Sequence, residues 1–272
     1  MYSSKWSNRF PVVRQAAEPI DHVECSLNVI LNLMSMVRLD SLTYNCNSRQ
    51  QLLTLSFAIM LKIESVELIE INLPLVHFFE TSFGRTYKRR IIVVRVEDVD
   101  GAEGWGEVTC GESPGYSDEW TDSAWVTTEK ILAPMVVGCE VESASHVWGL
   151  MKWARGHRMA KAGIETACWN LEAKKLGVPL WRHLGGVNQE IECGVSIGIQ
   201  DSVKLLLGKI QTELDAGYKR IKIKISPRWD YDVIKAVRAE FGDILLMGDA
   251  NSAYTLADID LLKSLDEFDL II

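Results

Sequence analysis

The sequence lacks paired cysteines, an excess of basic residues and any long uninterrupted apolar run. Its 6 cysteines lie far apart and form no CxxC pair, which leaves a zinc site without support and is typical of reduced thiols in the cytoplasm. The formal net charge of −8 excludes a general basic surface for nucleic acid. The apolar stretch from Leu52 to Ile63 is interrupted by polar residues and is shorter than the roughly 20 residues that span a bilayer. We therefore expect a soluble, cytoplasmic protein that binds neither nucleic acid nor membrane.

Apolar residues are nonetheless abundant enough, at 47% of 272 residues, to form a sizeable core. The chain divides into three parts. Residues 1–60 match no clear pattern and form an extension of unknown role. Residues 61–155 predict an α+β domain, and residues 156–272 predict strands that alternate with helices. The elements expected in the second part are strands at 63–74, 90–97 and 105–109, arranged as a meander, and helices at 123–136 and 144–153.

The third part begins with the strongest helical pattern of the sequence, at residues 159–176. Its apolar face consists of Ala160, Ile164, Ala167, Cys168 and Leu171. Strands are expected afterwards at 192–199, 220–225, 244–248 and 270–272, and helices at 202–216, 231–241 and 256–265. Strands that alternate with helices of this length imply parallel strands joined by right-handed crossovers. This rhythm leaves two folds open, a (β/α) barrel and an open doubly wound sheet.

Two lysines, Lys222 and Lys224, alternate with isoleucines in the predicted strand 220–225. Side chains at positions i and i+2 share one face of a strand, so both ammonium groups point the same way. Two lysines inside a barrel are costly unless they face a site, where repulsion and desolvation favour the neutral amine that can act as a base. For this motif alone, a solvated lysine face on an edge strand is the simpler explanation.

The next predicted strand ends in the tetrapeptide Gly248-Asp249-Ala250-Asn251. Catalytic groups of parallel α/β folds lie at the carboxyl ends of strands. By itself the tetrapeptide is equally well explained as a loop in which Asp or Asn caps a turn. The two motifs together carry more weight, because lysines at one strand end and a carboxylate at the next converge. We therefore expect Lys224 and Asp249 to lie near one another at the carboxyl ends of adjacent parallel strands.

The combination of KxK on one strand and DAN at the end of the next, 25 residues apart, resembles the enolase superfamily. MAKAGIETACWNLEAKKLGVPLWRHLGG, residues 159–186, resembles the helix that leads into the family's barrel. FFETSFGRTYKRRIIVVRV, residues 78–96, resembles the substrate-covering loop and second strand of its capping domain, and EGWGE at 103–107 matches too. The segment ETSFGRTYKR points to the branch of o-succinylbenzoate synthases and N-acylamino acid racemases. The resemblance covers residues 62–272.

The resemblance implies an α/β fold in which an α+β capping domain is followed by the first part of a TIM-like (β/α) barrel, with one divalent metal, Mg²⁺ or Mn²⁺. Lys224 would be the general base or acid at the carbon next to the substrate carboxylate, and Lys222 would tune it electrostatically. Asp249 would be the first of three metal carboxylates. The residues expected to border the substrate are Ser196, Asn251 and, in the specificity loop, Thr81, Ser82, Phe83 and Arg85.

The chain is expected to be incomplete. Residues 191–272 supply three strands and the start of a fourth, whereas a whole (β/α)₈ barrel takes about 250 residues. The other metal carboxylates, and the lysine opposite KxK, would lie beyond residue 272. We therefore expect the isolated chain to be inactive.

An o-succinylbenzoate synthase-like dehydratase of the menaquinone pathway is the function that the resemblance favours. Its substrate would be a small carboxylate, and the family often forms homo-oligomers. N-acylamino acid racemase is the nearest alternative, ahead of dipeptide epimerase and muconate cycloisomerase. Two alternatives belong to another class of protein, namely a non-catalytic truncated gene product and a binding module that uses the capping domain alone.

Overall fold

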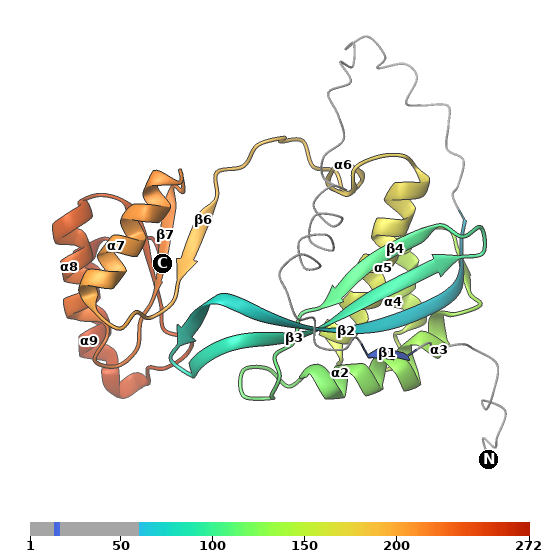
Figure 1. The fold of residues 1–272 in the computed structure, drawn as a ribbon, viewed down its shortest axis with the longest axis horizontal. Coiled ribbons are helices and arrows are strands. Elements are labelled where there is room, and N and C mark those ends of the chain that lie inside the picture. Colours follow the sequence, from blue (N-terminus) through green and yellow to red (C-terminus); the bar gives the residue numbers. More distant parts are fainter. Residues whose placement is uncertain (1–13, 17–59) are drawn as a thin grey trace, which may run out of the picture. The chain divides into compact units, whose positions relative to one another are not determined.

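The structure, a computed structural model, describes residues 14–16 and 60–272, and these fall into two compact units (Figure 1). As described, the first unit comprises residues 14–16, 60–73 and 89–187. The second comprises residues 74–88 and 188–272. Of the predicted extension, residues 1–60, only residues 14–16 and residue 60 are described, and the rest lies outside the described residues.

A sheet of five strands forms the centre of the first unit. Strands β1 (Arg14–Ala16), β2 (Leu61–Thr81), β3 (Gly84–Asp98) and β4 (Glu103–Val108) are neighbours in that order, and β5 (Glu140–Val141) also pairs with β2. The predicted meander of β2, β3 and β4 is therefore confirmed. Strand β2 runs past Pro74, where the sequence predicts its end, and continues into the second unit. Proline is tolerated there because β1 pairs with β2 only over Leu68–Glu70, so that at residue 74 the strand is an edge among the described residues.

The helix predicted at 123–136 is present as three consecutive helical segments over residues 121–136, whereas the one predicted at 144–153 ends at Leu150. The helical elements of the first unit are α2 (Thr121–Thr127), a π-helical turn (Thr128–Leu132), α3 (Ala133–Val136), a 3₁₀ turn (Ala144–His146), α4 (Val147–Leu150), α5 (Arg158–Lys175) and α6 (Leu180–His183). All five residues of the predicted apolar face of α5 are fully buried. Among the described residues, no helix is both long and apolar enough to cross a membrane.

Helix α5 packs on β4, and two glycines allow the close approach. A Cβ at Gly104 would lie 2.0 Å from the carbonyl oxygen of Ala167, and one at Gly106 would lie 2.2 Å from that of Gly163. This packing places α5 in the first unit, which ends at Val187. The sequence instead places a boundary after residue 155 and assigns α5 to the barrel. The two divisions differ because the helix that leads into the barrel buries its apolar face against the preceding sheet.

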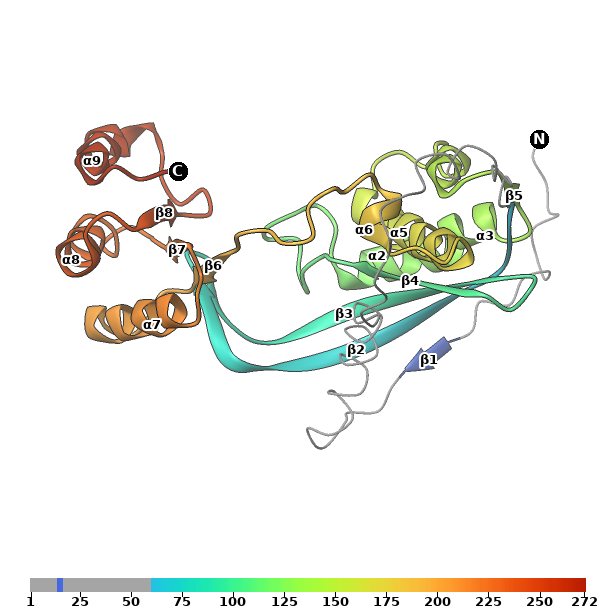
Figure 2. The same ribbon diagram turned by 90° about the horizontal axis from the view of Figure 1, so that it is seen from above.

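Three parallel strands form the sheet of the second unit, in the order β6 (Gly194–Ile197), β7 (Arg220–Lys224) and β8 (Leu245–Asp249). Helices α7 (Val203–Asp215), α8 (Tyr231–Phe241) and α9 (Ile259–Ser264) lie side by side along one face of it (Figure 2). On that face Ile221, Ile223 and Leu246 are fully buried. Short 3₁₀ turns flank α9, at Leu256–Asp258 and Leu265–Phe268.

The predicted fourth strand of the barrel, at residues 270–272, is not formed as a regular strand. The segment makes two backbone hydrogen bonds with β8. The N–H of Ile271 donates to the carbonyl of Leu246 at 2.9 Å, and the N–H of Gly248 donates to that of Ile272 at 3.0 Å. The alignment beside β8 is as expected, but two bonds over three residues do not make a ladder.

Candidate active site

Lys222 and Lys224 lie on the face of β7 opposite the helices. The alternation of a strand forces this arrangement, because Ile221 and Ile223, which alternate with the lysines, fill the helix-facing core. The Nζ of Lys224 lies 2.7 Å from Oδ2 of Asp249, and the Nζ of Lys222 lies 3.1 Å from the same oxygen. The side chain of Lys224 is 7% exposed, whereas that of Lys222 is 32% exposed. The predicted convergence of Lys224 and Asp249 at neighbouring strand ends is confirmed, and their roles stay predictions.

The carboxylate of Asp249 is held by Lys224, Lys222 and the backbone of Asn251. Strand register places it opposite Lys224. Its Oδ1 accepts the backbone N–H of Asn251 at 3.0 Å. Desolvation raises the pKa of Asp249, but hydrogen bonds from Lys224, from the Asn251 backbone and from Lys222 outweigh it and lower the pKa to about 2. The carboxylate is therefore ionised throughout the neutral range.

Asn251 completes the polar cluster from the loop after β8. Its Oδ1 accepts a hydrogen bond of 2.7 Å from Nζ of Lys224. Its backbone φ of 47° is left-handed, a conformation that asparagine tolerates better than most residues. Tyr254, in the same loop, donates to the buried Asp230 at 2.9 Å and so ties this loop to the one after β7. Sequence reasoning missed Asp230 and Tyr254, which carry no motif.

Ser196 stands opposite Lys222 in the register of β6 with β7, and its side chain is exposed. It therefore lies on the sheet face of the two lysines, as expected. It lies beside the candidate site, and its side chain forms no hydrogen bond within the described part of the chain.

The tip of the β2–β3 hairpin belongs to the second unit together with the three parallel strands. Thr81 accepts the N–H of Phe83 at 3.2 Å and so shapes the turn. The Oγ of Ser82 is buried and is without a hydrogen-bond partner in the described part of the chain. Phe83 is 60% exposed. Arg85 forms ion pairs with Glu80 and with Asp201, which lies in the loop after β6.

The tip docks on the carboxyl end of β6. The N–H of Ile199 donates to the carbonyl of Glu80 at 3.0 Å. A Cβ at Gly198 would lie 2.9 Å from the N of Glu80, so only glycine permits this approach. Because Ile197 is paired with Ile223, the next residue, Gly198, lies level with Lys224. All four predicted loop residues are thus brought to the strand end where the lysines lie. Sequence reasoning missed Glu80, Gly198 and Asp201.

A metal site is only partly present in these residues. Asp249 offers a carboxylate oxygen, the kind of ligand that Mg²⁺ and Mn²⁺ prefer. Within residues 14–16 and 60–272, however, no group of three His, Cys, Asp or Glu side chains could hold a metal ion. The described residues fit one ligand of such a site and do not complete it.

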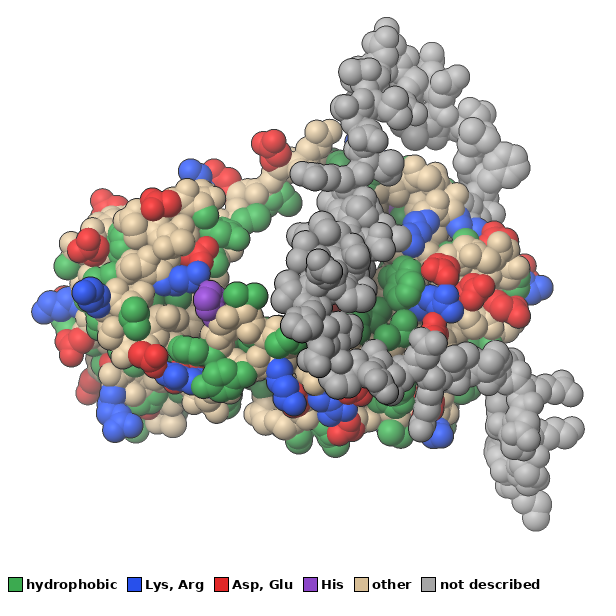
Figure 3. All heavy atoms as spheres, in the orientation of Figure 1, with side chains coloured by type: hydrophobic (Ala, Val, Ile, Leu, Met, Phe, Trp, Pro, Cys, Tyr) green, Lys and Arg blue, Asp and Glu red, His purple; other side chains and the backbone are tan. Residues whose placement is uncertain are grey.

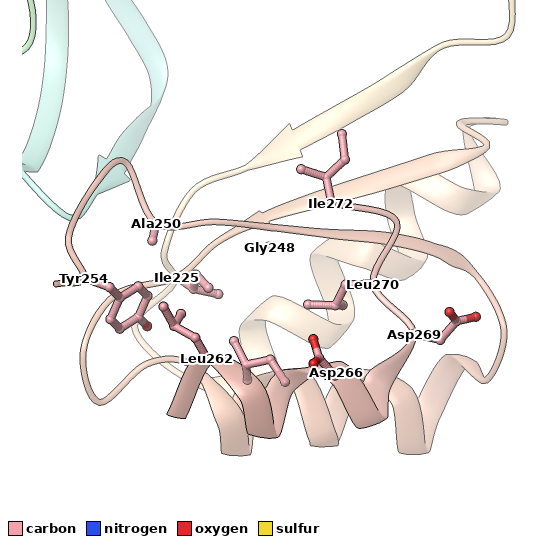
Figure 4. A pocket seen from close by; sticks show the side chains of 10 residues that line it. Ile225, Gly248, Ala250, Tyr254, Leu262, Asp266, Asp269, Leu270 and Ile272 are labelled. Carbon is pink, nitrogen blue, oxygen red and sulfur yellow. The ribbon is translucent and has the colours of Figure 1, made fainter. Parts of the chain in front are cut away.

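A separate cavity of about 480 Å³ lies against β8, α9 and residues 270–272 (Figure 4). Ile225, Gly248 and Ala250 line it from the strand ends, and Leu262 and Leu270 line it from the opposite side. These strand residues alternate with Lys224 and Asp249, so the cavity opens on the helix-facing side of the sheet. It is therefore distinct from the lysine and aspartate cluster.

The fold and the site define a class of protein, an α+β domain followed by parallel (β/α) units with a lysine and aspartate cluster at the strand ends. Two family models match the chain in succession. The mandelate racemase / muconate lactonizing enzyme N-terminal domain matches residues 64–185, and the enolase C-terminal domain-like family matches residues 207–272. The chain belongs to the enolase superfamily. The predicted fold class, an α+β capping domain followed by part of a (β/α) barrel, is confirmed.

Individual relatives agree with the predicted branch. An o-succinylbenzoate synthase from Geobacillus stearothermophilus is 46% identical over 211 residues, which cover 78% of this chain and 56% of that protein. An N-succinylamino acid racemase from Thermus thermophilus is 45% identical over 210 residues, covering 77% of this chain and 57% of that protein. A solved enolase-superfamily structure from Listeria innocua has a TM-score of 0.72 at 35% identity, covering 78% of this chain and 57% of that one. The chain thus spans somewhat more than half the length of the relatives it matches.

Proposed function

We propose that this chain carries the base-bearing half of an o-succinylbenzoate synthase-like dehydratase, which removes the proton next to a carboxylate. The observation that carries the proposal is the contact of the buried Lys224 with Asp249 across adjacent strand ends, at 2.7 Å. The 46% identity to the Geobacillus synthase supports the choice of reaction.

Lys224 is the group proposed to move the proton. Its Nζ donates to Asp249 and to Asn251, so it is held in one orientation at the strand end. From this position an ammonium group can deliver a proton as a general acid. To act as a base, Lys224 must first lose its own proton and at least one of these bonds. Lys222, which shares the Oδ2 of Asp249, is proposed to tune Lys224 electrostatically.

The proposed cofactor is Mg²⁺ or Mn²⁺, with Asp249 as one of its ligands. Bound there, the ion would stabilise the negative charge that gathers on the substrate carboxylate as the proton leaves. A hard cation needs several oxygen ligands, and the described residues supply one carboxylate. We therefore propose that these 272 residues by themselves turn over substrate negligibly.

The proposed substrate is a small carboxylate bordered by Ser196 and Asn251 and covered by the hairpin tip, residues 81–85. Figure 3 shows acidic and basic side chains interspersed over the visible face of the described part, with no large field of one sign to draw in a polyanion. A cytoplasmic location and a homo-oligomeric state are part of the proposal and rest on the cysteine spacing and on the family respectively.

An N-succinylamino acid racemase is the second candidate function. Its support is the Thermus relative, whose 45% identity is close to that of the synthase. Racemisation and dehydration start with the same step, removal of the proton beside a carboxylate, so the Lys224 site serves either reaction.

A chimera tests the proposal. The 211 matched residues of this chain would replace the corresponding part of the Geobacillus synthase, which serves unaltered as the positive control. With Mg²⁺, the chimera is expected to form o-succinylbenzoate. Lys224→Ala is expected to lower kcat by about 100-fold or more, the usual contribution of a general acid–base group. Lys224→Arg should not restore it, since a guanidinium stays protonated. Incubation with N-succinylamino acids, read by loss of optical purity, tests the racemase.

Two outcomes would contradict the proposal. A folded chimera that binds Mg²⁺ and turns over neither substrate would refute the function. An active chimera that tolerates Lys224→Ala would leave the function standing and remove Lys224 from it.

A further inference from the structure

Arg85 binds two carboxylates within the second unit, although its side chain stays 35% exposed. Its Nε donates to Glu80, which lies on the same hairpin, and its Nη2 donates to Asp201, which follows β6. The guanidinium carbon also lies 4.2 Å from the ring centre of Phe78. The hydrogen bonds that Arg85 donates to Asp201 and, next in effect, to Glu80 raise the pKa of Arg85 above its already high value. These contacts hold the guanidinium between its own hairpin and the loop after β6.

The two carboxylates that bind Arg85 come from segments far apart in the sequence. Glu80 and Arg85 flank the hairpin turn, and Asp201 is 116 residues away from Arg85. Beside this bridge, the carbonyl of Glu80 accepts the Ile199 N–H, and Gly198 meets the Glu80 backbone without space for a Cβ. The ionic bridge and the backbone contact therefore fix the same two segments against each other.

We propose that Arg85 and Asp201 are positioning residues, which hold the hairpin tip on the carboxyl end of β6 in one register. Arg85 bridges the tip to Asp201, and Glu80 orients the guanidinium for that bridge. The consequence is that Thr81, Ser82 and Phe83 are held at the carboxyl end of β6, level with Lys224. This assignment rests on the proposed function for its purpose, since the tip would cover the substrate, but its geometry is independent of any activity.

The exchange of the Ile199 amide hydrogen with deuterated water measures docking directly. This N–H is bonded to Glu80 when the tip is docked and is freed when the tip lifts. In the 272-residue chain, Asp201→Asn is expected to speed exchange at Ile199 about two- to five-fold, the typical effect of an exposed ion pair. Raising the salt concentration should speed exchange at Ile199 in the unaltered chain and leave exchange in Asp201→Asn nearly unchanged. Exchange at Ile223, inside β7, should not change, because the sheet is intact.

Two further variants sharpen the test. Gly198→Ala places a Cβ 2.9 Å from the Glu80 nitrogen and is expected to speed Ile199 exchange more than Asp201→Asn does. Asp122→Asn is the matched control. In the first unit, Arg90 bridges Glu70 and Asp122 in the way that Arg85 bridges Glu80 and Asp201. Asp122→Asn should leave the rate of amide exchange at Ile199 unchanged.

The results separate the two proposals. Unchanged exchange at Ile199 in Asp201→Asn, or equal acceleration at Ile199 and Ile223, would overturn the positioning role. In an active chimera, Asp201→Asn should raise KM about two- to five-fold and leave kcat nearly unchanged, since the tip is displaced and the base is not. A chimera without activity whose Ile199 amide still responds to Asp201→Asn would refute the proposed function and leave the positioning role standing.

Discussion

Replacing Gly104 by alanine should break the packing of α5 on β4. The new Cβ would lie 2.0 Å from the carbonyl oxygen of Ala167, 2.6 Å from the Cβ of Leu171 and 2.7 Å from its backbone nitrogen. All three atoms belong to the framework of α5, so no side chain can rotate away and the helix itself must move. Overpacking a core typically costs 1–3 kcal/mol, and the fixed neighbours place this change at about 3 kcal/mol or more. In a protein of this size, that corresponds to a fall in Tm of about 6–12 °C.

Thermal and urea unfolding, followed by circular dichroism, would measure the effect. Gly149→Ala is the matched control, since Gly149 lies in α4 of the same unit with nothing within 4 Å of the added Cβ. There the substitution should be neutral or should stabilise by up to about 1 kcal/mol, because alanine is the better helix former. A Gly104→Ala variant as stable as the Gly149→Ala control would refute the close packing of α5 on β4.

Two other predictions concern single carboxylates. Glu119 is buried and accepts hydrogen bonds from the N–H groups of Met159 and Ala160 at the start of α5, at 2.8 and 3.0 Å. Glu119→Ala should therefore lower the free energy of unfolding, measured by urea titration, by about 1–3 kcal/mol. Glu119→Gln should lower it by less. The pKa of Asp249 is lowered from 3.8 to about 2, so its stabilisation is present above pH 3.8 and lost as the pH falls towards 2. In Asp249→Asn, the free energy of unfolding should depend less on pH over that window, and the stability lost between pH 3.8 and 2 should shrink by at most about 2 kcal/mol. Thermal melts at several pH values measure this. A variant with the same pH dependence as the unaltered chain would contradict the lowered pKa of Asp249.

Local periodicity was sufficient to predict most elements and the centre of the site. The apolar face of α5 follows from helical spacing, and α8 begins and ends at the predicted residues. Lys224 and Asp249 could be brought together from the sequence because the side chains of a strand alternate and because parallel strands end at one edge. The length of β2 could not be predicted from the sequence. A proline such as Pro74 normally ends a strand, and whether the strand can continue through it depends on which edge is unpaired.

The docking of the hairpin tip lay beyond sequence reasoning for a different reason. The partners Arg85 and Asp201 are 116 residues apart, and neither stands in a motif that points to the other. One weak signal was present. Gly198 sits at the end of a predicted strand, where an isolated glycine marks a close approach of another backbone. That signal reveals a crowded position but does not identify Glu80 as the segment that crowds it.

The register of the small parallel sheet links the core to the site. Ile221 and Ile223 are fully buried under the helices, and this burial fixes which face of β7 is internal. A slip of one residue would turn both isoleucines out and both lysines into the helix-facing core, at a cost of several kcal/mol in lost apolar burial alone. The same register sets Gly198 level with Lys224, and so decides where the hairpin tip can dock. The apolar packing of three short strands therefore determines the position of the proposed base and the position of the loop proposed to cover its substrate.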